Sequence, residues 1–174
     1  MNGRILLAGE GRKLSTRAQE ITFKATRADG SSVSVFEVEV PPGFDVGAHV
    51  HDRSEEFFYV LEGQLEVLAF EPVEPTGERW QEWKSADGDH ALAAPAGSCM
   101  VVPAGCPHAF RNPTDMPARM LFHSFPSPDH ERYFEELSEI FSAGEAVDPR
   151  AVQRLRDRYD VNQITPLRYE PTRS

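Results

Sequence analysis

Residues that form turns recur about every dozen positions between residues 20 and 125, and this spacing limits the fold more than any other feature of the sequence. The runs between the turns are short and rich in Val, Phe and Thr, which favour extended backbone. Residues 21–26 and 31–40 flank Asp29-Gly30, and glycine accepts the positive φ that a tight hairpin turn demands. The pattern predicts antiparallel strands and an all-β domain. Because the apolar residues of 31–40 fall on two alternation phases, it also predicts a bulge near Val35.

Length and charge narrow the class of protein. A chain of 174 residues with 40% hydrophobic residues predicts one compact domain. Its formal net charge of −10 and the lack of a basic patch exclude nucleic acid and anionic membranes as expected partners. The apolar run from Ile5 to Ala8 is too short for a signal peptide or a membrane span. Cys99 and Cys106 do not form a disulfide framework. We therefore expect a cytoplasmic protein with reduced thiols.

The apolar period changes after Phe125, from strand-like to helical. Ser127-Pro128 is a predicted helix start and Gly144 a predicted stop, and Asp148-Pro149 is the predicted start of a second helix. The apolar faces are formed by Tyr133, Phe134, Leu137, Ile140 and Phe141 in the first helix, and by Val152, Leu155 and Tyr159 in the second. We expect both helices to pack on the outside of the β domain. Residues 1–126, with a long segment at 64–96, would form that domain, and residues 127–174 its helical extension.

Three histidines and a glutamate form the strongest candidate site. Residues two apart in a strand point to the same face, so His49 and His51 can both point into the β domain. Glu56 begins the next predicted strand and His108 a third, and four nitrogen and oxygen donors would then converge. Imidazole and carboxylate together suit Fe, Mn, Ni, Cu, Co or Zn. Glu55 is the alternative carboxylate if the preceding turn is tighter than assumed.

The same residues resemble a known family. Gly43-(five residues)-His49-x-His51-(four)-Glu56-(six)-Gly63 is similar to the first cupin motif. Gly97-(five)-Pro103-x-Gly105-(two)-His108-(three)-Asn112 is similar to the second. The resemblance implies a cupin jelly-roll barrel, commonly a homodimer, with one divalent transition metal held by His49, His51, Glu56 and His108.

Apolar residues near these ligands predict a substrate pocket. Phe110 shares the inward face of His108, and Phe58 shares that of Glu56. Met100 is a third candidate for the pocket, with core packing as the alternative. His123 in the last strand could orient a ligand imidazole. His90 and His130 are expected to be solvated. A cavity of this kind would suit a small aromatic or otherwise hydrophobic molecule.

Two further segments bear on assembly and access. Residues 56–70 are apolar on both alternation phases, which predicts a strand covered on both faces and suggests a dimer.

Trp80 and Trp83 lie in the long segment between the motifs. They either cap the barrel mouth as a lid or anchor the segment to the barrel wall, and anchoring is the favoured interpretation.

The ligand set indicates three classes of function. It resembles that of quercetin-dioxygenase-like cupins, which implies a dioxygenase for enolic or phenolic substrates such as flavonols and diketones, with Glu56 as ligand and general base. The second class is a non-redox cyclase, isomerase or lyase that uses the metal as a Lewis acid. The third is a cupin that binds a small molecule without turnover. Fold alone does not determine function, so all three classes are kept. The dioxygenase is the preferred hypothesis.

Overall fold

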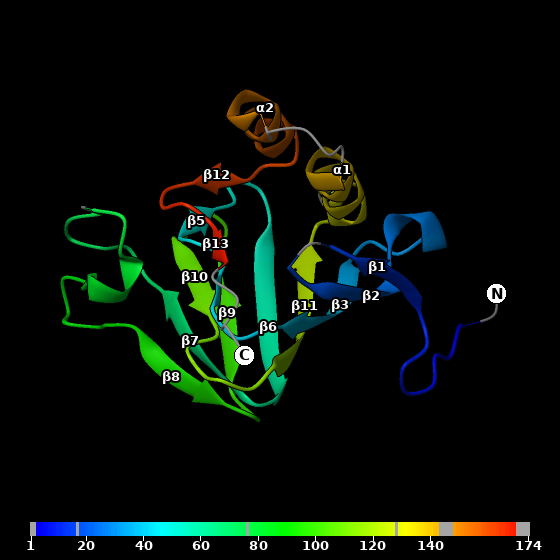
Figure 1. The fold of residues 1–174 in the computed structure, drawn as a ribbon, viewed down its shortest axis with the longest axis horizontal. Coiled ribbons are helices and arrows are strands. Elements are labelled where there is room, and N and C mark those ends of the chain that lie inside the picture. The colour runs from blue at the N-terminus through cyan, green and yellow to red at the C-terminus, as the bar shows by residue number, and fades with distance from the viewer. Residues whose placement is uncertain (1–2, 17, 76, 128, 143–147, 170–174) are drawn as a thin grey trace.

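The structure is a computed structural model, and it describes residues 3–16, 18–75, 77–127, 129–142 and 148–169. Two antiparallel sheets face each other across the core (Figure 1), so the predicted all-β class is confirmed. The first sheet has the spatial order β1 (Arg12–Ser15), β2 (Glu20–Ala25), β3 (Ser34–Val40), β11 (Ala118–Phe125), β6 (Glu55–Glu62) and β9 (Cys99–Val102). The second has the order β12 (Asn162–Gln163), β5 (His49–Val50), β10 (His108–Arg111), β4 (Phe44–Asp45) and β13 (Arg168–Tyr169), with β7 (Gln64–Ala69) paired to β10 and β8 (Leu92–Pro95) paired to β7.

Alternation of side chains builds the core of the first sheet. The even-numbered residues of β3, β6 and β11 point inward and are buried, except Glu62 at the end of β6. Strand register places Phe122 opposite both Phe36 and Phe58. The ring centroids lie 5.5 Å apart for Phe36–Phe122 and 5.0 Å apart for Phe58–Phe122, in stacked pairs. This row of rings forms one wall of the barrel interior.

The predicted hairpin is present, with one difference in detail. A short 3-10 turn (η1, Arg27–Asp29) and Gly30, whose φ is 80°, join β2 to β3. The register shifts between Phe23 and Ala25, which pair with Phe36 and Val35. The irregularity therefore lies beside Val35 as predicted, but the extra residue belongs to the partner strand β2.

The long segment between the motifs is anchored to the outer side of the second sheet. Trp80, in the 3-10 turn η2 (Trp80–Glu82), is fully buried, and Trp83 is almost so. Both pack against Ala48, Leu68 and Ala109, small or outward-facing residues of the sheet region. The indole Nε1 of Trp80 donates to Oδ1 of Asp45 at 2.8 Å. The tryptophans thus hold the segment against the wall, as the favoured interpretation expected.

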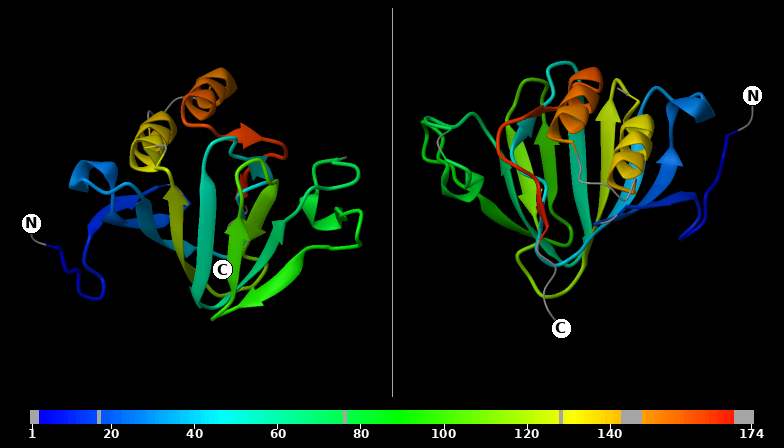
Figure 2. Two further views of the ribbon diagram at one scale, coloured as in Figure 1. Left: turned by 180° about the vertical axis from the view of Figure 1, so that it is seen from behind. Right: turned by 45° about the horizontal axis from the view of Figure 1, so that its top comes forward.

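Two helices lie across one open end of the barrel (Figures 1 and 2). Helix α2 (Pro149–Arg158) begins as predicted, because the Asp148 carboxylate accepts a hydrogen bond from the backbone N–H of Arg150. Helix α1 (His130–Ser142) begins two residues beyond Pro128, and the predicted signals at Pro128 and Gly144 lie outside the described residues. The described helices include none long and apolar enough to cross a membrane.

The chain does not remain helical after α2, in contrast to the predicted helical extension. It returns to the barrel, where Asn162–Gln163 pairs with β5 and Arg168–Tyr169 pairs with β4. Gly47 allows this close approach: its φ is +73°, and a Cβ there would lie 2.4 Å from the carbonyl oxygen of Thr165. The last described segment therefore pairs with β5, which carries His49 and directly precedes His51, and with the neighbouring β4.

Candidate metal centre

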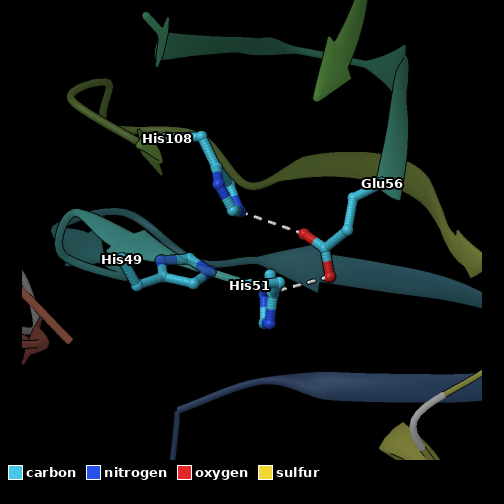
Figure 3. Close-up of side chains that lie close together, drawn as sticks. All are labelled: His49, His51, Glu56 and His108. Atoms are coloured by element: carbon cyan, nitrogen blue, oxygen red, sulfur yellow. Dashed lines mark hydrogen bonds and ion pairs between the residues drawn. The ribbon is translucent and has the colours of Figure 1, made fainter. Parts of the chain in front are cut away.

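Four side chains from three parts of the barrel converge at one point (Figure 3). His49 lies on β5 and is the register partner of His108 on β10. His51 directly follows β5, and Glu56 is on β6. All four are buried, and one potential ligand atom from each lies within 4.8 Å of those of the others. Glu55 is exposed, so the inward carboxylate is that of Glu56, in the predicted register.

Backbone carbonyls orient the three imidazoles. Nδ1 of His49 lies 3.0 Å from the carbonyl oxygen of Gly47, and Nδ1 of His108 lies 3.1 Å from that of Cys106. Nδ1 of His51 lies 2.6 Å from the carbonyl oxygen of Asp160. Each ring therefore donates from Nδ1 and directs the lone pair of Nε2 toward the common centre, the arrangement found in metal-bound histidines.

Asp160 is a residue of this centre that sequence reasoning missed. Its φ of 60° is left-handed, which Asp tolerates better than most residues. The position follows the C-terminus of α2, and that is the one signal that could have indicated it. Its buried carboxylate accepts hydrogen bonds from the backbone N–H groups of Asp52 at 3.2 Å and Arg53 at 2.9 Å. Asp160 thereby holds both the ring of His51 and the loop that follows it.

The donor set fits a divalent metal on chemical grounds. Nε2 of His108 lies 3.0 Å from Oε2 of Glu56, and Nε2 of His51 lies 3.2 Å from Oε1. A lone pair facing a carboxylate oxygen is repelled unless a proton or a cation lies between them. Adjacent ligands of an octahedral ion with bonds of ~2.1 Å lie about 3.0 Å apart. Oε1 of Glu56 is also buried without a hydrogen-bond partner among the described residues, as expected of an atom that binds a metal.

The charge states of these groups suit the same role. Burial alone would raise the pKa of Glu56, but positive charge on the surrounding imidazoles of His51, His108 and His130 outweighs burial and holds that pKa well below its usual range, and a bound cation would act in the same direction. Burial, together with the neighbouring His108 and His51, lowers the pKa of His49 well below its ordinary value. The site therefore presents an ionised carboxylate and a neutral His49 imidazole, the forms that bind metal ions.

A fourth histidine lies beside the cluster, which corrects the prediction that His130 is solvated. His130 is the first residue of α1 and is buried. Its Nδ1 lies 3.0 Å from the hydroxyl of Ser124 and 3.8 Å from Oε1 of Glu56. Burial lowers the pKa of His130 to about 4. The docking of α1 over the barrel end turns this residue inward, and no local pattern predicts that docking.

A cavity of about 80 Å³ opens beside the cluster and is lined by His49, His51 and Glu56, and we call it the metal chamber. Phe58 and Phe110 line it as predicted, together with Phe122. Met100 does not line it, but packs beneath Phe58 and Phe110 against a smaller apolar cavity of the core. From the helices, the chamber receives His130, Tyr133, Phe134 and Arg156.

A second, larger cavity adjoins the chamber, and we call it the outer cavity. Its volume is about 430 Å³. Phe44, Leu137 and Phe141 are among its apolar walls. The two cavities share five lining residues, namely Gln19, Val46, Tyr133, Phe134 and Leu167.

The other candidates lie away from the centre. His123 is on the outer face of β11 and stacks on Phe57 at 4.9 Å between ring centroids. The prediction that it orients a ligand imidazole is therefore wrong. His90 is exposed, in agreement with its prediction. Cys106 is partly buried against the core, and burial raises its pKa. These positions add no ligand to the cluster.

Comparison with known families agrees with this geometry. The Cupin family model matches residues 14–154, which include both predicted motifs. The chain belongs to the cupin family. Among curated proteins, it is 37% identical over 86 residues to polyketide synthase CurC of Streptomyces cyaneus, a match that covers 49% of this chain and 44% of CurC. It is 33% identical over 109 residues to protein SchB of Streptomyces halstedii, covering 60% of this chain and 66% of SchB.

Solved structures support the fold. KdgF from Halomonas sp. superposes with a TM-score of 0.56 at 15% identity, over 75% of this chain and 99% of KdgF. Ectoine synthase from P. lautus superposes with a TM-score of 0.54 at 14% identity, over 79% of this chain and 87% of the synthase. At these identities the similarity establishes the architecture alone.

Proposed function

We propose that this cupin is a metal-dependent enzyme that acts on an enolic or phenolic substrate of polyketide type, and that its reaction is a non-redox cyclisation or a related isomerisation. The observation that carries the proposal is the buried cluster of His49, His51, Glu56 and His108 beneath an apolar chamber. The similarity to CurC, whose name is that of a polyketide synthase, supports this substrate class. It also favours the non-redox class over the dioxygenase preferred from sequence.

The cavity sizes limit what can enter. A cavity of roughly 150 Å³ in a protein core is known to hold benzene. The metal chamber, at about 80 Å³, is smaller than that and suits an enol or phenol group with part of a ring. The outer cavity, at about 430 Å³, has room for the rest of an aromatic or multi-ring substrate. The proposed substrate therefore places one oxygen at the cluster and its apolar body between Phe44 and Phe141.

Glu56 has two roles in this proposal. Its lowered pKa keeps the carboxylate ionised, so one oxygen can bind the metal and the other can accept the proton of the substrate hydroxyl. A bound divalent metal would supply the positive charge that acidifies this hydroxyl and stabilises the resulting anion. The rings of Phe58, Phe110 and Phe122 exclude water from the anion, so that it reacts within the substrate rather than being protonated again.

The test combines metal analysis with turnover in the absence of oxygen. The protein is purified without chelator, its metals are quantified, and it is incubated with aryl diketones and flavonols under nitrogen and in air. We expect about one metal ion per chain and conversion under nitrogen with zinc. His49→Ala, His51→Ala and His108→Ala should lose the metal and keep a β-rich circular dichroism spectrum, whereas His90→Ala, at an exposed position, should retain it.

A dioxygenase is the second candidate, because four protein ligands leave two positions of a six-coordinate ion for a substrate and dioxygen. Oxygen uptake in step with substrate loss, and no conversion under nitrogen, would favour it over cyclisation. Binding without product in either atmosphere would indicate a cupin that binds its ligand without turnover. Full metal content in all three histidine variants would contradict the ligand assignment.

A further inference from the structure

We propose that Arg156, supported by Tyr133, binds a carboxylate of the substrate. The substrate is then an acid, and its carboxylate lies about 5 Å, one turn of α-helix, from the enolic or phenolic oxygen at the metal. This inference rests on the proposed function and narrows its substrate class. It follows from the position of Arg156, its missing partner and its neighbours.

Arg156 is the only Lys or Arg among the described residues that line the metal chamber. It lies in the last turn of α2, the helix that covers the barrel end. Glu56 is the only carboxylate among the same lining residues, and the metal ligands surround it. The chamber thus contains a cation that is not used by the metal cluster.

Arg156 also differs from the two nearest arginines on the same helix. Arg154 pairs with Asp148 at 3.7 Å, and Arg158 pairs with Glu136 at 2.7 Å. Arg156 forms no ion pair within the described part of the chain, and its Nε is buried there without a hydrogen-bond partner. Other described cations, such as Arg132 and Arg150, also form no ion pair, but Arg156 is the only one of these that lines the chamber and has a buried Nε without a partner. A buried N–H without a partner costs free energy that a bound anion would recover.

Helix α1 connects this arginine to the metal end. His130 lies beside Glu56, and Tyr133 follows one turn later with its ring centroid 6.3 Å from that of His130. The guanidinium of Arg156 lies beside the buried Tyr133: burial raises the pKa of the Tyr133 hydroxyl, and the neighbouring Arg156 opposes that effect. A carboxylate placed there would accept from the guanidinium and from the Tyr133 hydroxyl, which remains free to donate. Guanidinium binds planar carboxylates with two parallel hydrogen bonds, which favours this anion.

The test uses two probes of the same shape, 4-hydroxybenzoic acid and its neutral amide, whose hydroxyl oxygen and carboxyl carbon are separated by about one helical turn. The hydroxyl and the carboxyl or amide group lie at opposite ends of the ring, so neither probe can bind a metal through both groups. Binding to zinc-loaded protein is followed by isothermal titration calorimetry. We expect the acid to bind roughly 10- to 100-fold more tightly than the amide, the range for a charge-assisted hydrogen-bonded pair. R156Q should abolish this preference while leaving the affinity for the amide within about twofold.

Three further variants separate recognition from structure. Arg156→Lys should retain part of the preference for the acid, and Tyr133→Phe should reduce it several-fold. Arg154→Gln, a change at a paired surface arginine of the same helix, should leave it unchanged. Melting temperatures show whether each variant folds, and Arg156→Lys replaces R156Q if the latter does not.

Equal affinity for the acid and the amide, or failure of both to bind at millimolar concentration, would overturn the inference. So would an equal loss of both affinities in R156Q, because that result indicates a purely structural role. Failure of the proposed function gives a different result. In that case the protein takes up no metal, yet it still binds the acid more tightly than the amide, and this preference still depends on Arg156. Turnover without a preference for the acid would leave the proposed function intact and remove this inference alone.

Discussion

At the scale of single residues, the centre depends on carbonyl oxygens that fix the direction of each imidazole. Two of these carbonyls belong to residues two positions before the histidine they hold, Gly47 for His49 and Cys106 for His108. The third belongs to Asp160, which is 109 residues from His51 in sequence. Sequence spacing could therefore predict the four ligand candidates, but not the group that positions His51.

Asp160→Ala tests this support. Loss of the carboxylate frees the backbone of Asp52 and Arg53, and Ala is less favourable than Asp in left-handed backbone. Because outer-shell partners typically contribute 10- to 100-fold to metal affinity, we expect zinc to bind about 10- to 100-fold more weakly. Competition with a chromophoric chelator measures the change, and Asp157→Ala on the surface of α2 is the control. The variant keeps the backbone carbonyl that accepts from His51, so affinity within twofold of the wild-type value would show that the Asp160 carboxylate is not needed to position that carbonyl.

His130 predicts how the folding of the metal-free protein depends on pH. Its pKa is about 4 when folded, whereas an unfolded histidine titrates near 6.5. Between these values the unfolded chain binds the extra proton, so the stability contributed by neutral His130 is complete above pH 6.5 and is lost as the pH falls toward 4. The loss amounts to at most about 3 kcal/mol. Urea unfolding at several pH values measures it, and His130→Gln should flatten the slope whereas His90→Gln should not.

At the scale of elements, the strands were predictable because each residue's face follows from alternation alone. Phe36, Phe58 and Phe122 are inward on that basis, and strand register then brings their rings together. The helices were predictable as elements but not in their position. Their apolar faces show that they pack on something, yet only the fold shows that this is the open end above the metal cluster. That is why His130 and Arg156 were not recognised as lining residues.

The tryptophan segment gives a prediction at the same scale. Trp80→Ala would leave a cavity between the segment and the sheet, and we expect it to lower the free energy of unfolding by about 3–5 kcal/mol. Metal affinity should change little, because Trp80 packs on the outer side of the sheet. Urea unfolding and zinc titration measure the two effects. Reduced turnover with unchanged stability would instead support a lid, and Trp80→Phe separates ring packing from the hydrogen bond to Asp45.

At the scale of the whole molecule, one face of the first sheet suggests how two copies associate. Phe57 and Tyr59 on β6 lie beside Val101 and Cys99 on β9, and all four point away from the core. Tyr59 is 38% exposed and Val101 is 65% exposed. Apolar residues grouped in this way on a sheet face are typical of an interface. We propose that this face forms the homodimer that was expected from the sequence.

Light scattering coupled to size exclusion tests the dimer. We expect a mass of about twice the 19.5 kDa of one chain. Tyr59→Glu combined with Val101→Glu should shift the protein to the single-chain mass, because burying unpaired carboxylates in the interface is costly. Val73→Glu adds a charge at an exposed valine outside this face and should not. A wild-type mass of one chain, or a dimer that survives the double change, would contradict the proposal.

The link between His51 and Asp160 also sets an order of events when the chain is made. Ribosomes add about 5–20 residues per second, so the 109 residues between the two positions require roughly 5–20 s. During that interval His49, His51 and Glu56 already exist, but the carbonyl that directs His51 has not been synthesised. A nascent chain therefore carries His51 without the carbonyl that directs its ring toward the metal. Selective uptake of the correct ion must wait until translation has passed the second helix.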